Sequence, residues 1–171
     1  MNTKAELEIL AAGAYASVQD GGRRGHRRIG VPWAGALDPR LMRIANALAG
    51  NAEGAPVIEC FDGGLQVAAR GGAVRVAVAG DASVEVEGRE GRRNLPSWRS
   101  VTLAEGESLR IRRMLSGRIA VVAVADLALP AVMGSAATYV RAGLGGLGGG
   151  GAVEKDVRPA PPPPPPGGGG P

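Results

Sequence analysis

The chain has 171 residues, a length typical of one domain, and its 20 Lys and Arg against 16 Asp and Glu give a net charge of +4. The one cysteine, Cys60, and the one histidine, His26, exclude an intramolecular disulfide, a cysteine-based zinc site and a two-histidine motif, so we expect no metal site. The chain has few aromatic side chains on which nucleic-acid bases could stack: two Trp, two Tyr and one Phe. We therefore expect no nucleic-acid partner.

The first strand is predicted at 6–9, where charged and apolar residues alternate. A polar stretch follows at 19–28, with three glycines that let backbone amides approach a ligand and with adjacent arginines that can fork onto a carboxylate or phosphate. On residue chemistry alone a solvated basic loop is favoured, and a nucleic-acid patch is the weakest alternative. His26 is a candidate general base, but a surface-loop role is favoured.

A helix is predicted over about residues 38–49. Asp38 is a good N-cap because its carboxylate can accept the free amides of the first turn, and Pro39 suits the first helical position. Gly50 can take the left-handed conformation that ends a helix. The predicted apolar face holds Leu41, Ile44, Ala45 and Leu48.

Glu59 and Cys60 lie in the short apolar run 57–61. A carboxyl group inside an apolar strand has to be paired or functional, so Glu59 is either a site residue or half of a structural ion pair, and the sequence does not choose between them. Cys60 is favoured as a small buried residue rather than as a nucleophile.

Alternation returns at 74–78, 84–87 and 109–112, with turn-forming residues between these segments. Short strands with regularly spaced turns are typical of a sandwich or a closed barrel. The apolar run at 119–125 predicts a central strand covered on both faces. We therefore expect an all-β fold with one or two short helices, in which the helix at 38–49 packs over one end of a barrel.

No apolar run approaches the roughly 20 residues that a membrane-spanning helix needs. The N-terminal sequence has acidic residues where a signal peptide has its apolar stretch. These features favour a cytoplasmic protein without a membrane partner.

The C-terminal residues differ in kind. Residues 143–151 are mostly glycine, and 159–171 combine a six-proline run with glycines. Such composition cannot bury apolar surface, so a disordered tail is favoured. A ligand for a proline-binding module and the scar of a truncation are the alternatives.

Two strings carry a resemblance to a known family. VQDxGRxG…GVPxxGAxD spans 18–38, and ANxLxGN spans 45–51. Further matches follow at Glu59, at the turn 80–81, at 98–100 and at 134–135. Over about residues 7–157 the sequence resembles the biotin-dependent carboxyltransferase family, also called the allophanate hydrolase subunit 2 family, which includes the C subunit of 5-oxoprolinase.

The resemblance implies a cyclophilin-like β-barrel over 1–142, as the N-terminal half of a longer chain, followed by a Gly/Pro-rich linker and disordered tail over 143–171. It implies a component of an ATP-dependent amide or lactam hydrolase that opens 5-oxoproline to glutamate, with the other subunits of that complex, one of them of related fold, as partners. The alternatives are the carboxyltransferase part of a urea carboxylase or allophanate hydrolase system, and a non-catalytic regulatory remnant. ATP would be used by the assembly, and biotin would arrive on another chain because no Met-Lys-Met occurs here.

The substrate expected from this resemblance is a small amide that carries a carboxylate. The residues expected to act on it are Gln19, Asp20 and Glu59 as catalytic residues, with Arg23, Asn46, Gly22 and Gly25 binding substrate. The chain departs from the family pattern at Arg24, where proline is common, and the second half of the family's length is absent. A site formed between the two halves of the family's chain would then be lined by residues of one half only. We therefore expect a truncated chain that is inactive alone.

Overall fold

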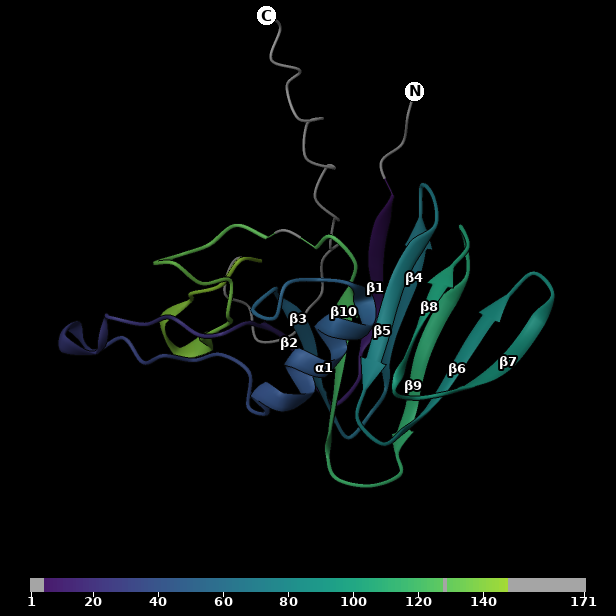
Figure 1. Ribbon diagram of the computed structural model, residues 1–171, viewed down its shortest axis with the longest axis horizontal. Coiled ribbons are helices and arrows are strands. Elements are labelled where there is room, and N and C mark those ends of the chain that lie inside the picture. Colours follow the sequence, from purple (N-terminus) through teal and green to yellow (C-terminus); the bar gives the residue numbers. More distant parts are fainter. Residues whose placement is uncertain (1–4, 128, 148–171) are drawn as a thin grey trace, which may run out of the picture.

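The computed structural model describes residues 5–127 and 129–147 and consists mainly of two five-stranded antiparallel sheets (Figure 1). The first sheet has the order β1 (Glu6–Ala12), β4 (Leu65–Arg70), β9 (Ser108–Met114), β6 (Ala82–Gly88) and β7 (Gly91–Pro96). The second has the order β2 (Tyr15–Gln19), β3 (Val57–Phe61), β10 (Ile119–Val124), β5 (Val74–Ala79) and β8 (Arg99–Leu103). One α-helix, α1 (Pro39–Ala49), and two 3₁₀ turns, η1 (Arg27–Ile29) and η2 (Val140–Ala142), complete the described part.

The expectation of an all-β fold with a short helix is confirmed, but the expected closed barrel is wrong. Strand pairing stops at β1 and β7 in one sheet and at β2 and β8 in the other, so both sheets are open. The apolar faces of the two sheets meet in one core, which draws residues from nearly every strand. Alternation along a strand marks its buried face but not whether the sheet closes on itself, which is why the sequence pattern did not distinguish the two architectures.

The second sheet is buried on both of its faces. In β10, Ala120, Val122 and Val124 face the core between the sheets, while Val121 and Ala123 pack under α1. The predicted central strand with two covered faces is therefore confirmed. The continuous apolar sequence of this strand follows from its two packing partners.

Helix α1 lies across the outer face of the second sheet, against β5 and β10, and not over the end of a barrel as expected (Figure 1). Its caps are as predicted. Asp38 accepts hydrogen bonds from the backbone amides of Arg40 and Leu41, and Gly50 takes the left-handed conformation with φ +87°. The buried face is rotated from the predicted one: its residues are Met42, Ala45, Asn46 and Ala49.

Small side chains account for this rotation. Ile44 was expected in the core but is 41% exposed, whereas Ala45 and Ala49 are buried against Ala77 and Ala123 of the sheet. Alanines on both surfaces let the helix approach the sheet closely, which a larger isoleucine side chain would prevent.

We expect replacement of the helix cap to lower stability. Asp38→Ala removes the acceptor for two backbone amides at 2.9 and 3.2 Å. The free energy of unfolding should fall by about 1 kcal/mol in urea titrations. Glu53→Ala, which removes an exposed carboxylate that caps no helix, is the matched control. Equal losses in the two variants would contradict the capping role.

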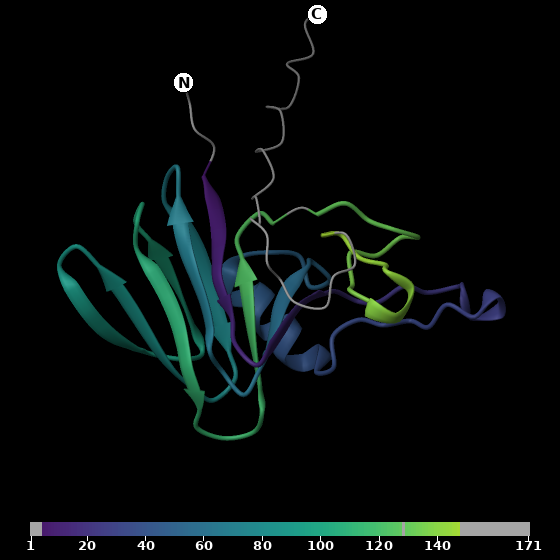
Figure 2. The ribbon, with the colours of Figure 1, turned by 180° about the vertical axis from the view of Figure 1, so that it is seen from behind.

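Between β2 and α1 the chain forms an arm, defined here as residues 21–35, that projects away from the sheets (Figure 1, dark blue; Figure 2). Its backbone bonds are mainly internal: the amide of Arg23 donates to the carbonyl of Trp33 at 2.5 Å, and η1 forms the tip. At the base, a Cβ on Gly35 would lie 2.9 Å from Gly22 Cα, so the two backbone segments touch. The arm contains residues 21–28 of the polar stretch noted at 19–28, whereas Gln19 belongs to β2. The favoured solvated loop is wrong for Gln19 and Arg23, which are buried.

The described chain ends in a segment that folds back onto the domain. Gly146 donates to the carbonyl of Ala136 at 3.0 Å, and Leu147 packs against the core. A linker and disordered tail that buries no apolar surface was expected over 143–171. That expectation is wrong for Leu147, and residues 148–171 lie outside the described ranges. Over the ranges that are described, no helix is long and apolar enough to cross a membrane.

Candidate functional site

The polar residues at the end of β2 converge on one segment, residues 132–138, which lies beside the base of the arm. Asp20 Oδ1 accepts from the backbone amide of Gly22 at 2.8 Å and from the Ser135 hydroxyl at 2.6 Å. Its Oδ2 accepts from the amide of Ala136 at 2.7 Å. Asp20 therefore joins the arm to the 132–138 segment, with both carboxylate oxygens engaged.

Arg23 makes the second connection. Its side chain is fully buried, and its Nε donates to the carbonyl of Val132 at 2.8 Å. Its Nη2 donates to the carbonyls of Ser135 at 3.2 Å and Ala137 at 2.9 Å. Three backbone carbonyls thus compensate the burial of this cation, and no carboxylate among the described residues forms an ion pair with it.

Gln19 lies beside this connection and is 7% exposed. Its Nε2 donates to Ser17 Oγ at 2.9 Å and to the carbonyl of Thr138 at 3.3 Å. Two buried side-chain atoms here have no partner within the described residues: Oε1 of Gln19, an acceptor, and Nη1 of Arg23, a donor. Nε2 of Gln19 and Nη2 of Arg23 donate to the carbonyls of Thr138 and Ala137, so both side chains contact the 132–138 segment.

The two glycines expected to bind substrate have different surroundings. Gly22 has φ +88°, and a Cβ there would lie 2.9 Å from the carbonyl oxygen of Ala34, so only glycine fits without a shift of the backbone. Gly25 has φ +89° but borders open space on the arm. Gly22 is therefore part of the convergent site, whereas Gly25 stands away from it.

Glu59 lies on β3, directly opposite Ser17 of β2, and is 3% exposed. Its Oε1 accepts from the backbone amides of Leu37 at 2.7 Å and Asp38 at 3.3 Å, where the chain enters α1. The structural alternative, an ion pair, is not what the structure shows. Burial raises the pKa of the Glu59 carboxyl, and the two amide donors oppose that rise.

We expect Glu59 to make stability depend on pH. A carboxyl group whose pKa is raised by folding stabilises the folded protein at low pH. This contribution is lost as the pH rises from the pKa of the unfolded state, about 4.3, through the pKa of the folded state. Glu59→Gln keeps an acceptor for both amides and removes this loss. In urea titrations the variant should gain stability relative to wild type between about pH 4 and neutral pH. The exposed control Glu53→Gln should show no such trend, and a pH-independent difference at Glu59 would contradict the inference.

Asn46 is placed apart from the convergent site, on α1. It is fully buried, and its Nδ2 donates to the carbonyls of Glu53 at 3.2 Å and Ala55 at 2.9 Å. Its Oδ1 accepts from the side chain of Asn51 at 3.2 Å. Asn51 in turn donates to the carbonyl of Val124, so the pair ties the end of the helix to the end of β10.

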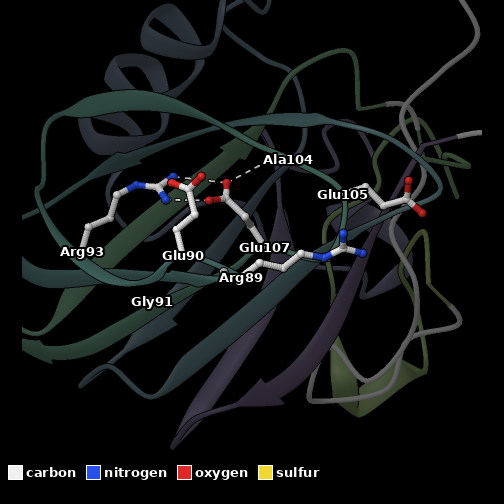
Figure 3. A pocket seen from close by; sticks show the side chains of 9 residues that line it. Arg89, Glu90, Gly91, Arg93, Ala104, Glu105 and Glu107 are labelled. Carbon is white, nitrogen blue, oxygen red and sulfur yellow. Dashed lines mark hydrogen bonds and ion pairs between the residues drawn. The ribbon is translucent and has the colours of Figure 1, made fainter.

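A separate hollow of about 350 Å³ lies where the β6–β7 turn meets the β8–β9 turn (Figure 3). Arg93 donates hydrogen bonds to both carboxylate oxygens of Glu107, at 2.5 and 3.2 Å, and Glu107 also accepts from the amide of Ala104. The hydrogen bonds from Arg93 are the main reason that the pKa of Glu107 is lowered. Besides this ion pair, Arg89, Glu90 and Glu105 line the hollow, so its charged groups are of mixed sign and no cation is in excess.

The segment that the polar stretch contacts was not predicted from the sequence. Residues 132–138 received no functional role, although the pair Gly134-Ser135 was among the matches to the family. The available signal in the sequence was a serine directly after a glycine in a segment without strand alternation, and that glycine takes a positive φ in the structure. Hydrogen bonds across more than a hundred residues have no local sequence pattern, so the pairing itself needed the structure.

The fold is therefore that of an open two-sheet β domain, and its buried polar site lies at the base of the arm. The family described as the carboxyltransferase domain, subdomain A and B, matches residues 29–166, and the chain belongs to this family.

Individual relatives agree with this assignment. The chain is 37% identical over 148 residues to the C subunit of Escherichia coli 5-oxoprolinase, covering 84% of this chain and 45% of that protein. It is 32% identical over 145 residues to urea amidolyase of Saccharomyces cerevisiae, covering 84% of this chain and 8% of that protein. The crystal structure of Kluyveromyces lactis urea carboxylase superimposes with a TM-score of 0.83 at 27% identity, over 92% of this chain and 14% of that one. The chain thus spans less than half the length of each of these relatives.

Proposed function

We propose that this chain is part of the carboxyltransferase-type subunit of an ATP-dependent lactam hydrolase of the 5-oxoprolinase kind, acting on 5-oxoproline to give glutamate. The observation that carries the proposal is the 37% identity to the C subunit of 5-oxoprolinase over 84% of the chain. Its partners are the remaining subunits of such a complex, including one of related fold.

The two unpartnered atoms at the base of the arm support an amide substrate. A lactam has an N–H donor and a C=O acceptor side by side on one edge of its ring. Gln19 Oε1 offers an acceptor for the N–H, and Arg23 Nη1 offers a donor for the oxygen. A buried donor and acceptor left without partners are costly, and a ligand that pairs with both removes that cost.

The other residues around this locality have supporting roles in the proposal. Asp20 and Gly22 hold the base of the arm against the 132–138 segment and so fix the positions of Gln19 and Arg23. Glu59 is the candidate acid–base group, because burial moves its pKa upward, toward the pH at which such groups work.

ATP binds elsewhere in the proposed assembly. The polar stretch at 19–28 is not a phosphate-binding loop of the GxxxxGK[ST] type. ATP supplies the free energy for opening an unactivated amide. The residues of this chain bind and orient the lactam.

A second candidate function is the carboxyltransferase step of a urea carboxylase, with carboxybiotin carried on another chain. The match to urea amidolyase and the TM-score of 0.83 to urea carboxylase favour it. Urea also has adjacent N–H and C=O groups, so the same two atoms suit it. The two candidates differ in the carboxylate, which 5-oxoproline has and urea lacks.

Reconstitution separates the candidates. The matched residues in the C subunit of Escherichia coli 5-oxoprolinase are replaced by this chain, and the chimaera is assembled with the other subunits of that enzyme. We expect ATP-dependent formation of glutamate from 5-oxoproline and no consumption of urea. A chimaera that assembles and is inactive on 5-oxoproline would contradict the proposal, and transfer of carboxyl groups from biotin to urea would establish the second candidate.

A further inference from the structure

A hollow of about 360 Å³ lies between the base of the arm and the first turns of α1, beside the candidate site. Arg24 and Trp33 line it from the arm, and Met42 and Arg43 line it from the helix. Asp20 of the candidate site also belongs to its lining. Arg24 and Arg43 are exposed, so a ligand from solvent reaches both guanidinium groups without rearrangement of the core.

The charge of this hollow is unbalanced. Neither Arg24 nor Arg43 forms an ion pair within the described residues. Asp20 is the one acid in the lining, and its oxygens already accept three hydrogen bonds, from Gly22, Ser135 and Ala136. Two cationic donors are thus left facing a cavity in which the one carboxylate is directed elsewhere.

The Trp33 ring contacts two arginine side chains at one side of this hollow. The guanidinium carbon of Arg24 lies 5.1 Å from the ring centroid, and that of Arg27 lies 5.3 Å from it. Both distances are within the range of cation–π attraction. A guanidinium held against a ring loses less entropy when it binds an anion than a free one does.

We propose that this hollow binds a small oxyanion, a carboxylate or a phosphate, with Arg24 and Arg43 as the hydrogen-bond donors and with the Trp33 ring supporting Arg24. Arginine suits this chemistry because its planar fork matches two oxygens of either group. The proposal is independent of the proposed function, because anion binding is a property of this chain by itself. If the anion is the carboxylate of the lactam substrate, the hollow provides the subsite that distinguishes 5-oxoproline from urea.

The test uses the indole N–H signals in NMR spectra of the full chain, titrated separately with 5-oxoproline, inorganic phosphate and 2-pyrrolidinone. The chain has two tryptophans, so Trp98, which hydrogen-bonds to Asp81 at a different hollow, serves as an internal reference. We expect a saturable shift of the Trp33 signal with 5-oxoproline or phosphate and none with 2-pyrrolidinone, which lacks the carboxylate. The anion that produces the shift identifies the source of the oxyanion.

Variants then locate the donors. Arg24→Gln and Arg43→Gln should each weaken the binding of the shifting anion about tenfold or more, as expected for a lost charged hydrogen bond. Arg89→Gln removes the same charge from the exposed β6–β7 turn of the other sheet, at a separate hollow. It should leave the affinity within about twofold of wild type, because exposed charges farther apart than a Debye length of about 10 Å are largely screened. No Trp33 shift with either anion, or equal affinities in all three variants, would overturn the proposal.

Discussion

Arg23→Lys is expected to lower the free energy of unfolding by about 2–4 kcal/mol, although it preserves the positive charge. The guanidinium of Arg23 is fully buried and reaches three carbonyls of the 132–138 segment through two of its nitrogens. A lysine ammonium cannot reproduce that planar geometry, so at least one buried carbonyl loses its donor. Urea titrations measure the loss directly.

Arg28→Lys is the matched control, because Arg28 lies exposed at the tip of the arm. It should change the free energy of unfolding by less than about 0.5 kcal/mol, as surface substitutions usually do. If Arg23→Lys were as stable as this control, Arg23 would not connect the arm to the 132–138 segment.

Asn46→Ala is the second substitution with a large expected effect. It removes two donated hydrogen bonds and the acceptor for Asn51 at a fully buried position. With two carbonyls and one amide left unsatisfied, the free energy of unfolding should fall by about 2–4 kcal/mol. Asn94→Ala, on the exposed strand β7, is the control and should be close to neutral.

The two possible roles of Asn46 make different predictions for the reconstituted enzyme. A structural role lowers stability and leaves the Michaelis constant for 5-oxoproline unchanged in the fraction that is folded. A substrate-binding role raises that constant with little loss of stability. The three hydrogen bonds of Asn46 favour the first result.

Much of the fold was predictable from local pattern. The strands β1, β5, β6, β9 and β10 follow alternation or a continuous apolar run, and α1 has its caps in the sequence. β7 was not predicted because it is an edge strand, exposed on both faces, so no apolar alternation marks it. The openness of the sheets and the position of the helix depend on long-range packing, in this case of small residues such as Ala45 against Ala77.

The candidate site was predictable in composition but not in geometry. The sequence drew attention to Gln19, Asp20 and Arg23, and the structure brings these three together. Their shared partner, the 132–138 segment, is more than a hundred residues away in sequence, and no local spacing reveals such a contact. The sequence drew attention to the adjacent arginines of the polar stretch, Arg24 among them, as groups that can fork onto a carboxylate or phosphate. Arg43 received no ligand-binding role, because the hollow that it shares with Arg24 exists only once the arm and α1 are folded.

The central claim is that the convergent site binds the amide edge of a lactam, and the most direct measurement is the kcat/KM for 5-oxoproline of the reconstituted enzyme with Gln19→Met. This variant keeps the length of the side chain and removes the unpartnered Oε1 of Gln19, together with the Nε2 that donates to Ser17 and Thr138, so kcat/KM is compared at equal unfolding midpoints. Gln66→Met on β4, in the other sheet, is the control. We predict a loss of about tenfold to a hundredfold for Gln19→Met, the range for one hydrogen bond to a substrate, and no loss for the control. Equal kcat/KM for Gln19→Met and wild type, at equal unfolding midpoints, would contradict the claim.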